Sequence, residues 1–183
     1  MHAPKNPLKA ALAAKQVQTG IWLNLASAHA AELLAGSGFD WLLIDAEHGP
    51  NSIPTMLAQV QAIGARVPVV VRPPMGETWM IKQILDLGVQ TILVPMIEDA
   101  GHAAEMVRAM HYAPKGNRGV ASAVVRASDY GRIKDYMASA NDETCLILQV
   151  ESRAGLRALP DLLALDGVDA VFVGPSDLAA DMG

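Results

Sequence analysis

The sequence predicts an α/β fold with a parallel sheet, a (β/α)₈ TIM barrel that is truncated after its sixth strand. Short apolar runs rich in β-branched residues alternate with longer segments of helical spacing. Runs such as Leu42–Ile44 and Val67–Val71 are apolar at consecutive positions, as expected where helices cover both faces of a parallel sheet. No glycine-rich dinucleotide loop follows the first strand, which favours a barrel over a Rossmann sheet.

Each element follows from this alternation. Strands are expected at the short apolar runs: Thr19–Leu25, Trp41–Glu47, Val67–Pro73, Thr91–Ile97, Cys145–Ser152 and Ala170–Pro175. Helices are expected between them, each ending at a glycine or at a loss of pattern: Ser27–Ala35, Ile53–Ile63, Thr78–Leu87, Asp99–Met110 and Leu156–Leu165. The long connection from His111 to Asn141 breaks the spacing and contains a further predicted helix at Ser128–Ala138. Long connections of this kind are usually functional walls or lids.

The 183 residues fit a single domain, residues 1–183, but such a barrel usually takes about 250. We therefore expect an incomplete barrel that lacks its last two strands and their helices. Hydrophobic residues make up 51% and charged residues 18%, which excludes a disordered chain. The formal net charge is −5 and no basic run interrupts it, so nucleic acid is not an expected partner.

The expected compartment is the cytoplasm. The single cysteine, Cys145, lies in an apolar run and cannot form an intramolecular disulfide, which favours a reducing setting. The apolar stretch from Ala10 to Ala14 is too short for a signal peptide. No apolar run approaches the roughly 18 residues that span a bilayer, so we expect a soluble protein without a membrane partner.

Polar residues gather at the predicted carboxyl ends of the strands, where the active sites of barrels lie. Glu151 and Asp177, from neighbouring strands, are oxygen ligands that suit a hard divalent cation such as Mg²⁺ or Mn²⁺. Strand alternation continued from Val171 through Val173 and Pro175 puts Asp177 on the same face as these residues. Asp177 could instead be a helix N-cap, and Glu151 could pair with Arg153 at the surface.

His48 and Arg72 also end predicted strands. His48 is the only one of five histidines in such a place, and Asp45 could orient its ring and raise its basicity. A structural role at the turn before Gly49 is the alternative. Arg72 is costly to bury unpaired, so it is expected to meet a carboxylate or an anionic substrate. The residues alone thus predict a metal-dependent lyase or hydrolase.

Six motifs follow one another along the chain: Gly38–His48, Val71–Pro73, Leu93–Met96, Arg118–Val120, Gln149–Glu151 and Val173–Leu178. Together they resemble the HpcH/HpaI aldolase family over essentially the whole chain. The resemblance implies a class II pyruvate aldolase that reversibly cleaves 4-hydroxy-2-oxo acids, such as 4-hydroxy-2-oxoheptanedioate, to pyruvate and an aldehyde in aromatic catabolism. The family's barrel continues beyond the position of Gly183.

The resemblance also implies roles for the residues at the strand ends. Glu151 and Asp177 would bind a divalent metal, Mg²⁺, Mn²⁺ or Co²⁺, with no organic cofactor. His48, supported by Asp45, would be the acid/base, and Arg72 would steady the enolate oxygen.

The remaining implied roles concern substrate and assembly. Gln149 would hydrogen-bond near the metal, and Glu47 would stand behind its ligands. The backbone amides around Gly174, Pro175 and Ser176 would hold the pyruvate carboxylate. The full-length parent is expected, by resemblance, to be a homo-oligomer, a hexamer.

Three alternatives stay open. The chain could be a catalytically incompetent barrel fragment that serves in binding or assembly, because an open sheet would expose two edges. It could be a related 2-dehydro-3-deoxyglucarate aldolase, or a lyase acting on acyl-CoA thioesters. A Schiff-base aldolase is disfavoured because no lysine ends a predicted strand: Lys82, Lys115 and Lys134 fall on helices or loops.

Overall fold

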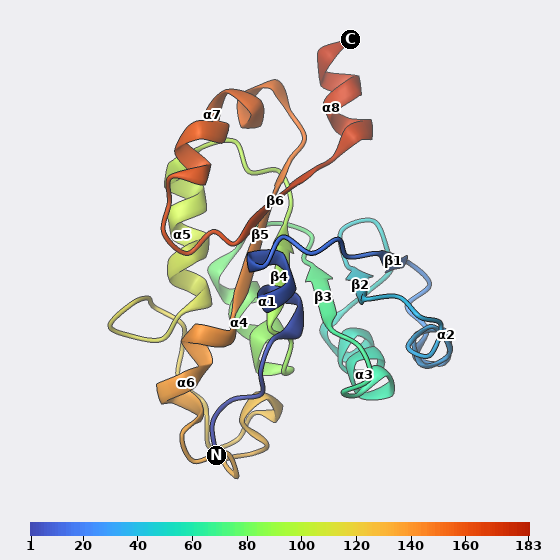
Figure 1. Ribbon diagram of the computed structural model, residues 1–183, viewed down its shortest axis with the longest axis vertical. Helices are drawn as coiled ribbons and strands as arrows, with labels where there is room; N and C mark the ends of the chain where they lie inside the picture. Colours follow the sequence, from blue (N-terminus) through green and yellow to red (C-terminus); the bar gives the residue numbers. More distant parts are fainter.

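The computed structural model describes residues 1–183 and centres on one sheet of six parallel strands that follow chain order. The strands are β1 (Gly20–Leu23), β2 (Trp41–Asp45), β3 (Val69–Arg72), β4 (Thr91–Val94), β5 (Cys145–Val150) and β6 (Ala170–Val173). The sheet curls as part of a barrel does, with β1 and β6 at its two edges (Figure 1). The predicted α/β class and parallel sheet are confirmed, whereas a closed eight-stranded barrel is not seen.

Every predicted strand is present, but each ends one to three residues before its predicted end. The backbone contacts beyond β2 and β4 explain why these strands end early. The backbone N–H groups of Glu47 and His48 bond the Asp45 carboxylate, and that of Met96 bonds Glu151. These backbone groups therefore hold side chains of the polar strand ends instead of a neighbouring strand.

Both faces of the sheet are covered by apolar side chains, as the consecutive apolar positions predicted. The outer face packs under the helices in a cluster of 26 buried residues that includes Leu42, Ile44 and Val71. The alternate residues Leu43, Val70 and Leu93 point to the inner face, where Leu8 of the first helix packs against them. A strand alternation thus assigns Asp45 and Arg72, two residues beyond Leu43 and Val70, to the inner face.

Eight α-helices surround the sheet: α1 (Pro7–Ala13), α2 (Ala28–Leu34), α3 (Ile53–Ile63), α4 (Thr78–Asp86), α5 (Ala100–Met110), α6 (Tyr136–Glu143), α7 (Arg153–Leu163) and α8 (Pro175–Met182). Helices α2, α5 and α7 begin at side-chain caps, in which Ser27, Asp99 and Ser152 accept a hydrogen bond from a backbone N–H three residues later. No helix is long and apolar enough to cross a bilayer.

The connection between β4 and β5 differs from its prediction. A helix was expected at Ser128–Ala138, but the structure has a 3₁₀ turn at Arg126–Ser128 and α6 farther on. Between them Asp129 and Tyr130 are left-handed, with φ of 50° and 53°, which interrupts any helix.

Helix α1 was not predicted, and α8 was expected only in the alternative that made Asp177 a helix N-cap, a place that Gly174 takes. Helix α1 begins at Asn6, whose side chain accepts from the Lys9 N–H and reaches Thr91 of the sheet. Helix α8 begins at Pro175, a favoured first helical residue. The strand alternation that was extended through Asp177 is therefore wrong, because Asp177 lies in the first turn of α8. Helix α8 stands beyond the end of β6 (Figure 1).

Candidate active site

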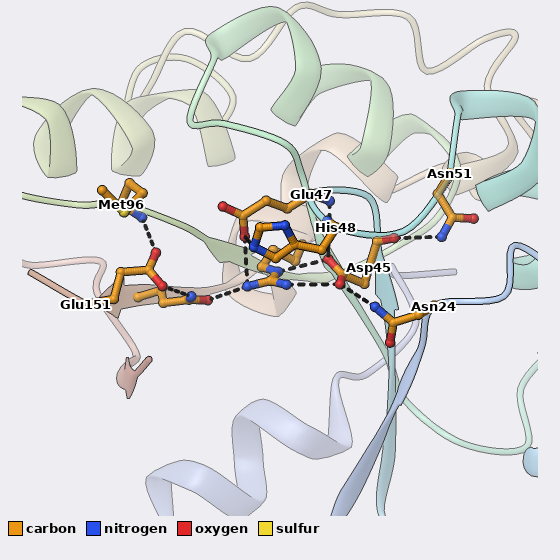
Figure 2. A network of polar contacts seen from close by, with 9 residues as sticks. Asn24, Asp45, Glu47, His48, Asn51, Met96 and Glu151 are labelled. Carbon is orange, nitrogen blue, oxygen red and sulfur yellow. Dashed lines mark hydrogen bonds and ion pairs between the residues drawn. The ribbon is translucent and has the colours of Figure 1, made fainter. Parts of the chain in front are cut away.

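Asp45 lies at the centre of the polar strand ends (Figure 2). It forms an ion pair with Arg72. The two residues end β2 and β3 and are direct register partners, so the sheet itself brings them together. Nε and Nη2 of Arg72 donate to Oδ1 and Oδ2 of Asp45, both at 2.9 Å. The side chains are only 7% and 1% exposed, so each charge compensates the other's burial.

Trp22 and backbone groups complete the environment of this pair. The guanidinium carbon of Arg72 lies 4.5 Å from the centroid of the Trp22 ring on β1. Burial raises the pKa of Asp45, but the hydrogen bonds and charge of Arg72, with the N–H groups of His48 and Glu47, outweigh it. The net pKa of Asp45 is therefore below its ordinary value.

Glu47 lies on the other side of Arg72. Its Oε2 is 2.7 Å from Arg72 Nη1, yet this buried oxygen has no well-aligned hydrogen bond. Burial raises the pKa of Glu47 above its ordinary value; the charge of Arg72 opposes that rise and the negative charge of Glu151 adds to it. The carboxylates of Glu47 and Glu151 therefore influence each other, and Oε2 of Glu47 has no hydrogen-bond donor.

The ring of His48 stands at the edge of this cluster. Its side chain is 65% exposed, and Nε2 lies 3.9 Å from Oε2 of Glu47. Asp45 bonds the backbone N–H of His48, at 3.4 Å, and makes no contact with the ring. The carboxylate beside the imidazole is therefore that of Glu47, and Asp45 supports His48 through its backbone.

Gln149 and Glu151 join the cluster from β5. Gln149 accepts from Arg72 Nη1 at 3.4 Å through Oε1 and donates to Glu151 through Nε2, so it links the guanidinium to this carboxylate. Glu151 is 3% exposed and accepts from the Met96 N–H at 2.9 Å, which places Glu151 inside the molecule. A Cβ on Gly174 would lie 2.5 Å from Glu151 Oε2, so only glycine fits beside this carboxylate.

The structure does not bring α8 into this cluster. Pro175, Ser176 and Asp177 are exposed, and the Asp177 carboxylate has no hydrogen bond or ion pair. No three His, Cys, Asp or Glu side chains are close enough together to form a metal site. The fit to a divalent cation comes from the donor set: buried Glu151 beside Glu47, whose Oε2 has no aligned donor and whose pKa is raised.

Sequence reasoning missed Trp22, Asn24, Asn51 and Met96. Asn24 donates to Asp45 Oδ2 at 2.6 Å, and Asn51 donates to the Asp45 backbone oxygen at 2.6 Å. Asn24 falls inside the strand predicted at Thr19–Leu25, where a polar residue next to Leu25 was the available signal. Met96 acts through its backbone, which no side-chain motif reveals.

Comparison with known proteins identifies the family of the chain. The family profile described as HpcH/HpaI aldolase/citrate lyase matches residues 18–183. The chain belongs to this family. The resemblance to the HpcH/HpaI aldolase family, which the six motifs indicated, is therefore confirmed.

Individual relatives are similar along nearly the whole chain. A hydroxypyruvate/pyruvate aldolase of Roseovarius nubinhibens is 53% identical over 184 residues, covering 100% of this chain and 72% of that protein. A 4-hydroxy-2-oxo-heptane-1,7-dioate aldolase of Escherichia coli is 54% identical over 181 residues, covering 98% of this chain and 69% of that protein. The crystal structure of an HpcH/HpaI aldolase/citrate lyase family protein from Burkholderia cenocepacia matches 98% of this chain and 72% of its own, with a TM-score of 0.92 and 42% identity.

Proposed function

We propose that this HpcH/HpaI chain is a metal-dependent class II aldolase that reversibly cleaves 4-hydroxy-2-oxo acids to pyruvate and an aldehyde. Membership of the family and relatives named as aldolases support carbon–carbon lyase chemistry. The observation that carries the proposal is the buried Arg72, held by Asp45, Glu47 and Gln149 at the carboxyl edge of the sheet. The names of the similar proteins favour 4-hydroxy-2-oxoheptanedioate as substrate, and hydroxypyruvate is a second compound to test.

Arg72 is suited to the charge that this reaction develops. Cleavage of a carbon–carbon bond beside a keto group leaves an enolate, whose negative charge must be stabilised as it forms. One edge of the guanidinium, formed by Nε and Nη2, is occupied by Asp45, so Arg72 is oriented before substrate arrives. Its Nη1 group, which faces Glu47 and Gln149, is the part left to steady the enolate oxygen.

Glu151 and Asp177 would hold a divalent cation, Mg²⁺, Mn²⁺ or Co²⁺. Such a cation supplies Lewis-acid stabilisation of a developing oxyanion when it is bound. The buried Glu151 fits a cation in its chemistry, and the negative charge of Glu47 beside it favours one. Asp177, exposed on α8 outside the cluster, has a carboxylate free of other partners and would be the second ligand that the resemblance implies. Glu47 would stand behind the ligands.

His48 would move the proton of the 4-hydroxyl group. Its ring is exposed at the mouth, where a substrate can reach it, and its Nε2 lies 3.9 Å from Oε2 of Glu47. Asp45 fixes the loop through the His48 N–H. The backbone amides around Gly174, Pro175 and Ser176 would hold the pyruvate carboxylate, and Gln149 would orient the keto group.

Assembly and setting belong to the same proposal. We expect a homo-oligomer, a hexamer by resemblance to the family, acting on small molecules in the cytoplasm in aromatic catabolism. The alternative substrates are 2-dehydro-3-deoxyglucarate and acyl-CoA thioesters, and each can be compared with 4-hydroxy-2-oxoheptanedioate as the compound that the chain cleaves.

The second candidate is a binding or assembly module without catalysis. Two observations favour it: β1 and β6 have unpaired edges, and an apolar cavity of about 180 Å³ opens on the inner face beside Leu12 and Phe172. A sharp thermal transition of a monodisperse, metal-responsive chain would count against this candidate.

The test is pyruvate release from 4-hydroxy-2-oxoheptanedioate, coupled to lactate dehydrogenase, with Mg²⁺, Mn²⁺ or Co²⁺ and with chelator. Release that needs a divalent metal and falls by orders of magnitude in His48→Ala supports the aldolase. Release that persists in chelator contradicts the metal requirement. A folded, metal-binding chain without release supports the non-catalytic module.

A further inference from the structure

Asn24 lies one residue past the end of β1, with its side-chain amide directed at Asp45 (Figure 2). The 2.6 Å distance from Asn24 Nδ2 to Asp45 Oδ2 is the shortest of the five hydrogen bonds that this carboxylate accepts. Arg72 Nη2 shares the same oxygen, at 2.9 Å. Asp45 Oδ2 therefore has two donors, one that anchors it to β1 and one that belongs to Arg72.

Asn24 joins the buried ion pair to the exposed loop after β1. Asn24 is exposed, whereas the side chain of Asp45 is 1% exposed. Without the amide, water would reach Oδ2 and compete with the guanidinium. A hydrogen bond to a charged group is stronger when water is excluded, so the amide helps to keep the clamp on Arg72 tight.

The loop that carries Asn24 is built to hold this position. Ala26, two residues later, has a left-handed backbone with a φ of 50°, a conformation that residues other than glycine rarely adopt. The loop after β2 packs closely on it: a Cβ on Gly49 would overlap the backbone oxygen of Asp45 and lie 3.3 Å from that of Asn24. The two loops therefore meet around the Asp45 carboxylate.

We infer that Asn24 is a positioning residue for the aldol cleavage: by holding Oδ2 of Asp45 it fixes the bidentate clamp on Arg72 and the direction of Nη1. This inference rests on the proposed function. Displacement of a catalytic group by about 1 Å is enough to slow a reaction by about 100-fold. Loss of one of several anchors displaces Arg72 less, so Asn24→Ala is expected to lower kcat about tenfold and to change KM less than threefold.

Asn24→Asp gives a signature that a merely structural role would not produce. The substitution is isosteric, but at pH 8.5 it sets a second carboxylate against Asp45, beside Glu47, His48 and Arg72. A carboxylate pair at this distance has one strongly raised pKa, so the new acid protonates on acidification and then donates to Asp45. The ratio of kcat in Asn24→Asp to kcat in the parent should rise at least fivefold from pH 8.5 to 6.

The control for the added charge is Gln61→Glu, because Gln61 is exposed on α3 and its side chain has no hydrogen bond. Its kcat ratio to the parent should stay near one at every pH. A kcat of Asn24→Ala within twofold of the parent, or an Asn24→Asp ratio that does not change with pH, overturns the inference.

A thermal-unfolding cycle tests Asn24 without relying on activity. Asn24→Ala should lower Tm in the parent and lower it clearly less in Asp45→Asn, where the charged acceptor of the Asn24 amide has already been removed. An equal decrease in both backgrounds overturns the inference. If the parent releases no pyruvate, the proposed function fails while the cycle still decides whether Asn24 acts through Asp45.

Discussion

Replacing Asp45 by Asn tests whether the buried ion pair organises the strand ends. Asp45 accepts from five donors: two nitrogens of Arg72, the Asn24 amide, and the N–H groups of Glu47 and His48. The replacement has one acceptor oxygen, so its NH₂ group must face donors whichever way it turns. Arg72 then loses its bidentate partner and keeps only the poorly aligned contact with Glu47.

The expected cost follows from the geometry. Removing one partner of a buried pair costs about 3–5 kcal/mol, and the retained amide oxygen puts Asp45→Asn at the lower end, about 3 kcal/mol. For a chain of 183 residues that corresponds to a decrease in Tm of about 6–12 °C. Urea unfolding followed by circular dichroism measures the free energy.

The exposed pair between Arg132 and Asp129 provides the control. Its side chains are 68% and 57% exposed, so Asp129→Asn should change the free energy of unfolding by less than about 0.5 kcal/mol. A loss below about 1 kcal/mol in Asp45→Asn would refute the reasoning, because it would mean that the pair is solvated and does not clamp Arg72.

The same substitution predicts a pH dependence. The pKa of Asp45 is lowered in the folded chain, so its stabilisation is fully present above the unfolded pKa of about 4 and is lost as pH falls through the folded pKa. The difference in unfolding free energy between parent and Asp45→Asn should stay constant from pH 8 to 5 and shrink below pH 4. A difference that shrinks between pH 8 and 6 would assign the effect to another group.

Three further predictions concern the neighbouring residues. Glu47→Gln should raise Tm at pH 7 and not at pH 4, because the raised pKa of Glu47 penalises folding only where the unfolded carboxyl is ionised; an equal effect at both pH values would contradict this. Glu151→Ala should lower Mn²⁺ affinity at least 100-fold by calorimetry and abolish chelator-sensitive activity, and unchanged affinity would remove Glu151 from the metal site. Gly174→Ala should reduce activity at least tenfold, since its Cβ would lie 2.5 Å from Glu151 Oε2, while Gly36→Ala, whose Cβ meets only an oxygen at 3.8 Å, should match the parent in rate and Tm.

The strand ends could be predicted from the sequence because parallel strands place their carboxyl ends at one edge. That rule alone brings Asp45, Arg72 and Gln149 to the same edge, and the structure shows them in contact. The rule fails at Asp177, because the apolar alternation runs smoothly into Pro175, where the chain begins a helix. Periodicity cannot distinguish a strand residue from the first turn of the helix that follows it.

Partner choice within the site could not be predicted, because it depends on distances between elements. Sequence proximity paired Asp45 with the His48 ring, since three residues separate them. The ladder between β2 and β3 instead sets Asp45 opposite Arg72, and a guanidinium with two parallel donors satisfies a buried carboxylate better than a single imidazole nitrogen. The ring is left to Glu47, whose side chain reaches past Arg72 towards it.

The charge balance of the cluster explains why Glu47 and Asp45 respond differently to burial. The carboxylates of Asp45 and Glu47 contact the guanidinium of Arg72, and that of Glu151 lies close enough to raise the pKa of Glu47, so three carboxylates share one guanidinium. Asp45 takes both parallel donors and its pKa falls, while Glu47 receives one misaligned contact and its pKa rises. A divalent cation would compensate the excess negative charge, so the arrangement that keeps Arg72 fixed also makes the Glu151 side of the cluster favourable for metal.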